Sequence, residues 1–328
     1  MSNFLTPEFI LSCWVFIVGL CIGSFLNVVI LRGLTDESIV FPSSKCPICQ
    51  NKLKWWMNIP VLSYLLIGGK CHYCKAKVSI QYPVVELATG IFFLLIYLTF
   101  GISLETLFYL IAFSLLMVIS VCDIKESVII DIHAYILAFF GLIFNAVTNG
   151  LDGFLFSLIG AVVGFLVYEL LARSGYLIAG QRAFGEGDSL IALGIGAFFG
   201  YKLMLVSVLL SGIIMAIFTF PYFYIHCKKN GKTKVCNALI LALVLIVGAY
   251  FVTKTDIIKT FSGSIIFLIT ITSIAFWCVK QLLANLKNDE EEKTSFCMLP
   301  FGPAMAVSFL LIMFFEKDIL TVLKSYFI

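Results

Sequence analysis

Two aspartates stand out in this chain of 328 residues because each borders a long apolar run. Asp123 closes the run "LLMVISVCD", and Asp188 ends "FGEGD" and begins the next apolar stretch. Two carboxyl groups a few ångströms apart cannot both ionise, so such a pair shares one proton. The ionised member accepts a proton from water while the protonated member donates to a carbonyl oxygen. If helix packing brings them together, Asp123 and Asp188 form the catalytic pair of an aspartic protease.

The glycines beside Asp188 suit such a site. Gly185 and Gly187 accept backbone angles that other residues avoid, and they let a second backbone approach closely. A peptide substrate lying beside Asp188 needs that approach. A simpler interpretation stays open, because Asp is a favoured helix N-cap and Asp188 stands where an apolar helix begins. Glu86 opens another apolar run, where it either helps to shape a site or only caps its helix.

A second group with chemical potential is a set of four cysteines, arranged as "CPIC" at 46–49 and "CHYC" at 71–74. Two C-x-x-C pairs about twenty residues apart have the ligand spacing of a tetrahedral, all-thiolate zinc site. Thiols stay reduced in the cytosol, which favours metal over a disulfide there. With four protein ligands the site is closed, so we predict structural zinc on Cys46, Cys49, Cys71 and Cys74. Redox-active or idle cysteines are the alternative.

The elements that must position these residues are apolar helices. Hydrophobic residues make up 61% of the chain and charged residues 12%, against roughly half and a quarter in soluble domains. Many apolar runs approach the roughly 20 residues that cross a bilayer, and lipid leaves helices as the structure for such runs. The first run, 9–31, is too long for the core of a cleaved signal and lacks a basic start. The predicted spans are 8–31, 84–100, 105–122, 131–149, 153–172, 189–200, 203–225, 237–252, 260–283 and 300–315.

The fold class that follows is an all-α polytopic membrane protein with about ten transmembrane helices and a small zinc-stapled cytosolic loop domain between the first two. An outside N-terminus places most of the 22 Lys and Arg residues in inside segments, as the positive-inside rule requires. Both aspartates then lie at cytosolic helix ends. A net charge of +3 gives no reason to expect nucleic acid as a partner. The predicted divisions are a first helix (1–31), a zinc-binding loop domain (32–82), a protease membrane core (83–225), inserted helices with connectors (226–298), and a last helix with a tail (299–328).

Six short motifs, in the same order, resemble the type IV prepilin peptidases, the leader peptidases of pilus and type II secretion systems. They cover residues 23–131, 182–201 and a short piece near the end. Two family features are absent: a proline where Ile130 stands, and a lysine where Leu190 stands. The motifs are "GSFLNVVILR" (23–32), the cysteine pairs around "NIPVLSYLL" (58–66), "YPVVELATG" (82–90), "CDIKESVIID" (122–131), "FGEGD" (184–188) and "LPFGP" (299–303).

The resemblance implies that Asp123 and Asp188 are the two catalytic aspartates and that "GEGD" is the G-x-G-D signature shared with presenilin-like intramembrane proteases. It implies cleavage of the short basic leader of prepilins or pseudopilins at the cytosolic face of the bacterial inner membrane. It also implies N-methylation of the new N-terminus with S-adenosylmethionine, whose binding residues the sequence does not identify. Substrates and membrane lipids are the expected partners.

Two other functions remain open at this stage. In a proton-coupled transporter the aspartates would relay protons, which predicts carboxylates near the bilayer midplane and repeated halves. In a membrane scaffold the zinc loop would bind a partner, and both aspartates would be replaceable.

Overall fold

The computed structural model describes residues 6–35, 37–41, 43–179, 182, 185–229 and 300–327, and over these residues the protein is helical. It divides into two compact units. The first comprises Met1–Glu169, Gly185–Ser211 and Pro300–Ile328, and it contains both aspartates and all four zinc-motif cysteines. The second comprises Leu170–Phe184 and Gly212–Leu299. The predicted spans 237–252 and 260–283 lie outside the described residues.

Helices α1 (Pro7–Gly33) and α3 (Gln81–Phe100) form a close pair in the first unit. Thr6 caps α1 by accepting a backbone N–H of the first turn. The pair is close because α1 carries glycine at the contact: a Cβ atom at Gly23 would lie 2.7 Å from the Cα atom of Glu86. Lipid provides no hydrophobic drive between helices, so small residues that allow backbones to approach are the usual basis of such contacts.

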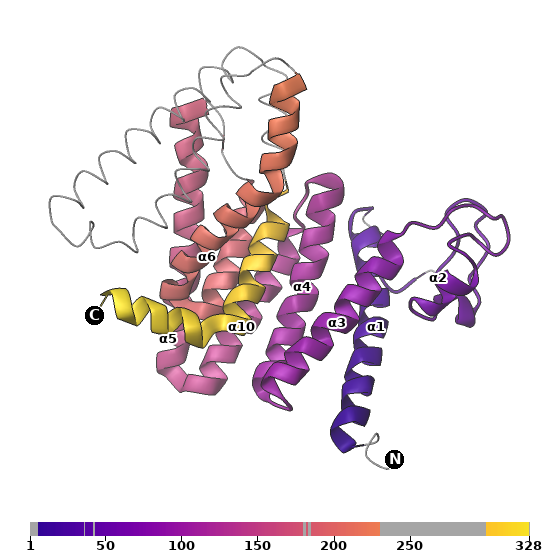
Figure 1. The fold of residues 1–328 in the computed structure, drawn as a ribbon, viewed down its shortest axis with the longest axis horizontal. Helices are drawn as coiled ribbons and strands as arrows, with labels where there is room; N and C mark the ends of the chain where they lie inside the picture. Colours follow the sequence, from indigo (N-terminus) through magenta and orange to yellow (C-terminus); the bar gives the residue numbers. More distant parts are fainter. Residues whose placement is uncertain are drawn as a thin grey trace. The chain divides into compact units, whose positions relative to one another are not determined.

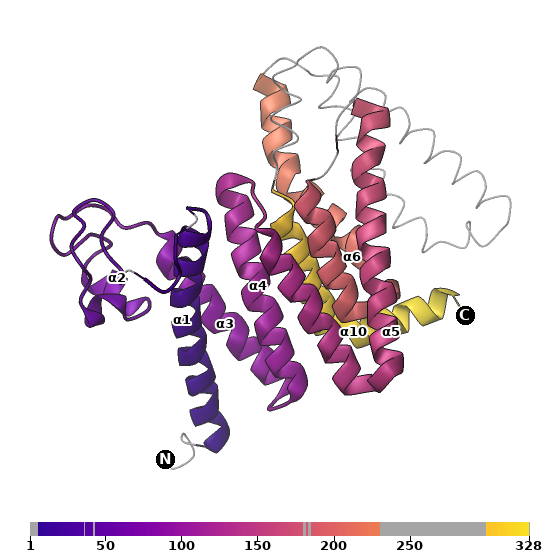
Figure 2. The same ribbon diagram turned by 180° about the vertical axis from the view of Figure 1, so that it is seen from behind.

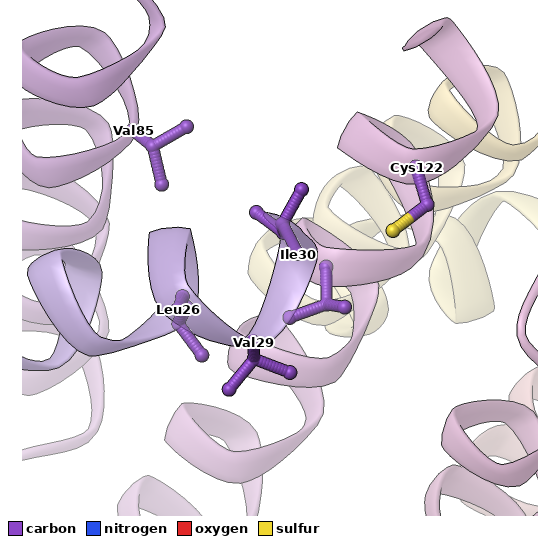
Figure 3. Close-up of a cluster of buried hydrophobic side chains, with 6 residues drawn as sticks. Leu26, Val29, Ile30, Val85 and Cys122 are labelled. Carbon is purple, nitrogen blue, oxygen red and sulfur yellow. The ribbon is translucent and has the colours of Figure 1, made fainter. Parts of the chain in front are cut away.

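Helix α4 (Leu104–Glu126) completes a three-helix layer with α1 and α3 (Figure 1). Ser103 caps its start by accepting the N–H of Thr106. At its end, Ser127 adopts a left-handed conformation with φ 52° and donates its N–H to the carbonyl of Asp123. Buried side chains of the three helices meet in one cluster near this end, as Figure 3 shows. The cluster contains Leu26, Val29, Ile30, Val85, Val118 and Cys122.

Two long helices each contain a glycine break. Within α5 (Asp131–Ala179) the break is Gly150, with φ 66° and ψ −149°, and within α6 (Glu186–Lys229) it is Gly200, with φ 70° and ψ 179°. Straight helices of these lengths would reach about 65 to 75 Å, at 1.5 Å per residue, and overshoot the bilayer core. The chain folds back at Gly150, which matches the break predicted between 149 and 153 (Figures 1 and 2).

Polar ties hold the two arms of α5 to the first arm of α6. Asn145 and Ser157, on either side of the break in α5, both donate to the carbonyl of Ala197, and all three residues lie in the first unit. Between these arms the backbones nearly touch, because a Cβ atom at Gly196 would collide with the carbonyl of Gly160. Both glycines are therefore needed for the packing.

The last described helix is α10 (Gly302–Phe327), which packs against α4 and is kinked at Phe315. Its aromatic residues interlock with neighbours. Phe309 meets the ring of Phe198 edge-on at 5.5 Å, and Phe198 stacks on Tyr109 of α4 at 6.3 Å. Offset and edge-to-face rings at such distances are the favoured geometries of aromatic pairs.

Between α1 and α3 lies a segment with little regular structure, comprising residues 34–80, which we call the cysteine lobe. It contains the short helices η1 (Trp55–Asn58) and α2 (Leu62–Leu66). Two isolated β-bridges, Lys45 with Lys52 and Lys70 with Lys77, enclose the two cysteine pairs.

The membrane character of the chain is clear, but the predicted number of spans is not confirmed. In the described part, five helices are long and apolar enough to cross a bilayer: α1, α3, α4, α5 through Ser174 and α6 through Thr219. Two of these helices, α5 and α6, contain the glycine breaks, so the number of membrane crossings differs from the number of helices. The predicted span 300–315 falls in α10, which is not among the five.

Candidate functional site

Asp123 lies in the last turn of α4 with 5% of its surface exposed. Its Oδ2 atom accepts the backbone N–H of Gly302, at 2.7 Å, from a residue 179 positions further along the chain. A Cβ atom at Gly302 would lie 2.9 Å from the same oxygen. The glycine of "LPFGP" is therefore the residue that lets the start of α10 close over the carboxyl group.

Asp188 lies in the first turn of α6 and is also 5% exposed. Its Oδ2 atom accepts the backbone N–H of Gly185 at 3.0 Å, so the glycine ahead of the helix holds the carboxyl group. The helix dipole favours a negative charge at this position. The hydroxyl of the next residue, Ser189, donates to the carboxyl group of Glu169 at 3.3 Å.

Gly187 does allow a close approach, and the approaching group belongs to the chain itself. A Cβ atom at Gly187 would lie 2.5 Å from the Cβ atom of Ile129. Ile129 follows Asp123 by six positions, beyond the left-handed turn at Ser127. The connector after α4 is thus packed against the first turn of α6, which carries Asp188.

A second chain of contacts joins the same elements. The ring of Phe301, next to Gly302, packs edge-on against Tyr168 with 6.0 Å between ring centroids. Tyr168 lies within electrostatic reach of Asp188 and hydrogen-bonds to Ser211 at 2.7 Å. The end of α4, the start of α6 and the start of α10 therefore meet in one region, and each contributes to the surroundings of an aspartate.

This arrangement can hold two carboxyl groups in a buried region, each fixed by a backbone N–H. Sequence reasoning identified both aspartates but gave no role to Gly302 or Tyr168. The motif "LPFGP" was the available signal for Gly302, since a glycine between two prolines at a helix start indicates a special backbone requirement. No pattern in the sequence singles out Tyr168.

The four cysteines form the second candidate site, as the spacing predicted. One sulfur from each residue lies within 4.8 Å of every other. The Sγ atoms of Cys46 and Cys74 are 3.9 Å apart, and those of Cys49 and Cys71 are 4.0 Å apart. Four sulfurs at 2.3 Å from a tetrahedral zinc would be separated by about 3.8 Å. The set therefore fits a zinc ion in number, chemistry and spacing.

The two cysteine pairs are built alike. The N–H of Gln50 donates to the carbonyl of Cys46, and the N–H of Lys75 donates to the carbonyl of Cys71. Both Gln50 and Lys75 adopt positive φ, near 58° and 59°, which closes each turn. Such turns bring the two sulfurs of a pair to the same side, ready to share one metal.

The turns also set the charge state of the thiols. Backbone N–H groups of Cys74 and Tyr73 face the sulfur of Cys71 and lower its pKa to about 6. At Cys74 the N–H of Ala76 acts in the same direction, but burial and the neighbouring thiols prevail and raise the pKa to about 11. The turn therefore favours the thiolate form at Cys71, and binding of a metal by all four cysteines requires loss of the proton of Cys74.

Glu86, whose role the sequence left open, is buried and points toward the cysteine lobe. Its Oε2 atom accepts the backbone N–H of Val61 at 2.7 Å. Nearby, Asn27 donates to the carbonyl of Tyr82 at 3.1 Å. The bond of Glu86 fastens the lobe to α3, and the bond of Asn27 ties α1 to the start of α3.

Comparison with known proteins places both sites in matched regions. Residues 17–100 match the "Bacterial Peptidase A24 N-terminal domain", and residues 110–220 match the "Type IV leader peptidase family". Three similar proteins are each named "Prepilin leader peptidase/N-methyltransferase". The one from Myxococcus xanthus is 37% identical over 194 residues, which are 59% of this chain and 58% of that protein. The protein from Neisseria gonorrhoeae is 35% identical over 222 residues, which are 60% of this chain and 77% of that protein. The protein from Pseudomonas aeruginosa is 33% identical over 226 residues, which are 61% of this chain and 77% of that protein. No solved structure matches the chain significantly.

Proposed function

Because the chain belongs to the type IV leader peptidase family, we propose that it is a membrane aspartic endopeptidase that removes the leader of prepilins or pseudopilins and then methylates the new N-terminus. The relatives named above carry both activities in their names. The observation that carries the assignment of residues is that Asp123 and Asp188 are both buried and both held by the backbone N–H of a glycine.

In this proposal one oxygen of each carboxyl group is fixed by the protein, and the second faces the substrate. The two groups share a proton between them. The ionised aspartate takes a proton from a water molecule as its oxygen attacks the scissile carbonyl, and the protonated aspartate donates to the carbonyl oxygen. The resulting tetrahedral intermediate collapses when the leaving amine receives a proton, so no covalent enzyme intermediate is required.

The cysteines would hold zinc in a supporting role. Cys46, Cys49, Cys71 and Cys74 supply four ligands, which leaves no position on a tetrahedral ion for a substrate. Zinc would cross-link the cysteine lobe, which is too poor in regular structure to fold by a core of its own. S-adenosylmethionine would donate the methyl group, and within the described residues no set of side chains identifies where it binds.

The family and the apolar helices also bear on where the protein is located and how the chain is divided. The apolar helices and the family indicate a multi-pass protein of the bacterial inner membrane. We propose that the aspartate site faces the cytosol, and that 32–82 and 83–225 are the zinc-binding and protease parts, with 226–298 as an insertion. The transporter alternative is not favoured, because Asp123 and Asp188 lie at the ends of their helices.

The direct test replaces each aspartate by asparagine, which keeps the shape and removes the charge. Purified Asp123→Asn and Asp188→Asn proteins are incubated with a prepilin, with and without S-adenosylmethionine, and the products are weighed by mass spectrometry. Asp131→Asn, at an exposed aspartate where α5 begins, is the matched control. We expect leader removal only by the wild type and the control. Cleavage at the wild-type rate by either test variant would refute the assignment.

A further inference from the structure

Helix α2 exposes its apolar face, which is the reverse of an ordinary surface helix. Leu62, Leu65 and Leu66 follow the i, i+3, i+4 spacing that places side chains on one face. They are 58%, 67% and 77% exposed, whereas Ser63, to the side of this face, is buried. Three leucines facing outward from a small lobe leave an apolar surface that nothing in the described residues covers.

The orientation of α2 is fixed by a buried group. Val61, just before the helix, has φ 59° and ψ −51°, and the N–H of Leu62 bonds to the carbonyl of Pro60 across it. A γ-turn with positive φ is rare, and it is strained for a β-branched residue. The carboxylate of Glu86 holds this turn through the N–H of Val61 at 2.7 Å. The structure thus maintains a strained turn that points the leucines outward.

The charges of the cysteine lobe indicate what covers the leucine face. Residues 34–80 contain six lysines, at positions 45, 52, 54, 70, 75 and 77, and two acidic residues, at positions 36 and 37. Trp55 is 80% exposed in η1, which contacts α2. Exposed leucine and tryptophan beside an excess of lysine is the composition of segments that lie in the membrane interface.

The position of the lobe fits the same environment. Both of its ends continue into apolar helices, α1 and α3, that are candidate spans. Figures 1 and 2 show the lobe as a separate body beside these two helices. A lobe tethered at both ends to membrane helices cannot leave the bilayer surface.

We propose that the α2 leucine face is an interfacial anchor, which seats the cysteine lobe on the bilayer while its lysines bind anionic lipid headgroups. The apolar side chains enter the boundary between headgroups and acyl chains, and each lysine near an anionic surface adds to the attraction. This inference depends on the membrane character of the chain and not on its proposed peptidase activity.

Fluorescence quenching by brominated lipid tests the anchor. The full protein is placed in nanodiscs whose lipids carry bromine near the headgroup end of the acyl chains. The chain has four tryptophans, so the signal of Trp55 is taken as the difference between each protein and its Trp55→Phe counterpart. We expect bromine to quench Trp55 strongly in anionic discs, and we expect the double variant Leu65→Gln/Leu66→Gln to lose most of this quenching.

A matched pair of substitutions controls for a general loss of apolar surface. Val40 and Ile48 are as exposed as the two leucines and belong to the same lobe, but they lie outside α2. Val40→Gln/Ile48→Gln should retain the quenching, and thermal unfolding should show that both double variants are folded. An equal loss in this control would overturn the assignment to α2.

Three further results would count against the proposal. Absence of quenching in the wild type would show that the face is not in lipid. Equal quenching in zwitterionic discs would overturn the role of anionic headgroups. Shielding of Trp55 in detergent by added prepilin, or by self-association, without quenching in discs would assign the face to a protein partner instead.

Discussion

Gly302 provides a sharp test of how the site is held together. Replacing it by alanine places a Cβ atom 2.9 Å from Oδ2 of Asp123. The oxygen must retreat by about half an ångström to reach van der Waals distance. Its hydrogen bond to the N–H of residue 302, now 2.7 Å long, then stretches to about 3.2 Å, the upper limit for a good N–H···O bond.

The expected cost follows from the charge on the acceptor. A hydrogen bond to a charged group contributes about 1.5–3 kcal/mol, and about 1.4 kcal/mol corresponds to a factor of ten in rate. If the bond orients Asp123 for catalysis, Gly302→Ala should lower kcat for leader cleavage by about ten- to a hundredfold. The measurement is the rate of leader removal from a prepilin by purified protein at saturating substrate.

The matched control is Gly212→Ala, because a Cβ atom at Gly212 meets nothing within 4 Å. Alanine in a helix interior is favoured over glycine by about 1 kcal/mol, so this variant should be active and at least as stable. Thermal unfolding of both variants separates a misplaced carboxylate from a misfolded protein. The reasoning fails if folded Gly302→Ala cleaves as fast as Gly212→Ala.

Two more expectations concern the cysteine lobe. Glu86→Ala should leave the N–H of Val61 without its acceptor, at a cost of about 1–3 kcal/mol, so limited proteolysis should cut residues 34–80 faster. Glu86→Gln keeps an acceptor oxygen and should restore the protection. Equal cutting of both variants would contradict the role of the bond. In metal-free protein the pKa of Cys71 is lowered from 9.0 to about 6, so its thiolate stabilises the lobe most above pH 9, and this stabilisation is lost as the pH falls from about 9 to about 6. The difference in thiolate ultraviolet absorbance between wild type and Cys71→Ser should disappear with a protonation midpoint near pH 6, and a midpoint near pH 9 would contradict the lowered pKa.

The local chemistry of this protein was predictable because it depends on short-range patterns. Two C-x-x-C pairs can place four sulfurs together only through tight turns, and those turns are present at Gln50 and Lys75. The break between two predicted spans coincides with Gly150, whose positive φ favours glycine. The assignment of catalytic roles to Asp123 and Asp188 remains a prediction.

The long-range ties were not predictable from one sequence. Nothing in the pattern around Asp123 indicates that its partner is the N–H of Gly302, since backbone donors exist at almost every position. The role of Glu86 depends in the same way on a single N–H of a strained turn 25 residues earlier. Periodicity identifies which faces are apolar, but not which backbone group a buried carboxylate will meet.

The bond between Asp123 and Gly302 has a consequence for the order in which the protein becomes active. The ribosome makes Asp123 long before it makes the helix whose first residue, 179 positions later, holds that carboxyl group. A nascent chain already threaded into the bilayer by its first helices therefore carries an unfinished centre. The protein would become able to cleave substrates late in its biogenesis, when α10 docks against α4. This order would keep partly inserted chains from cutting substrates prematurely.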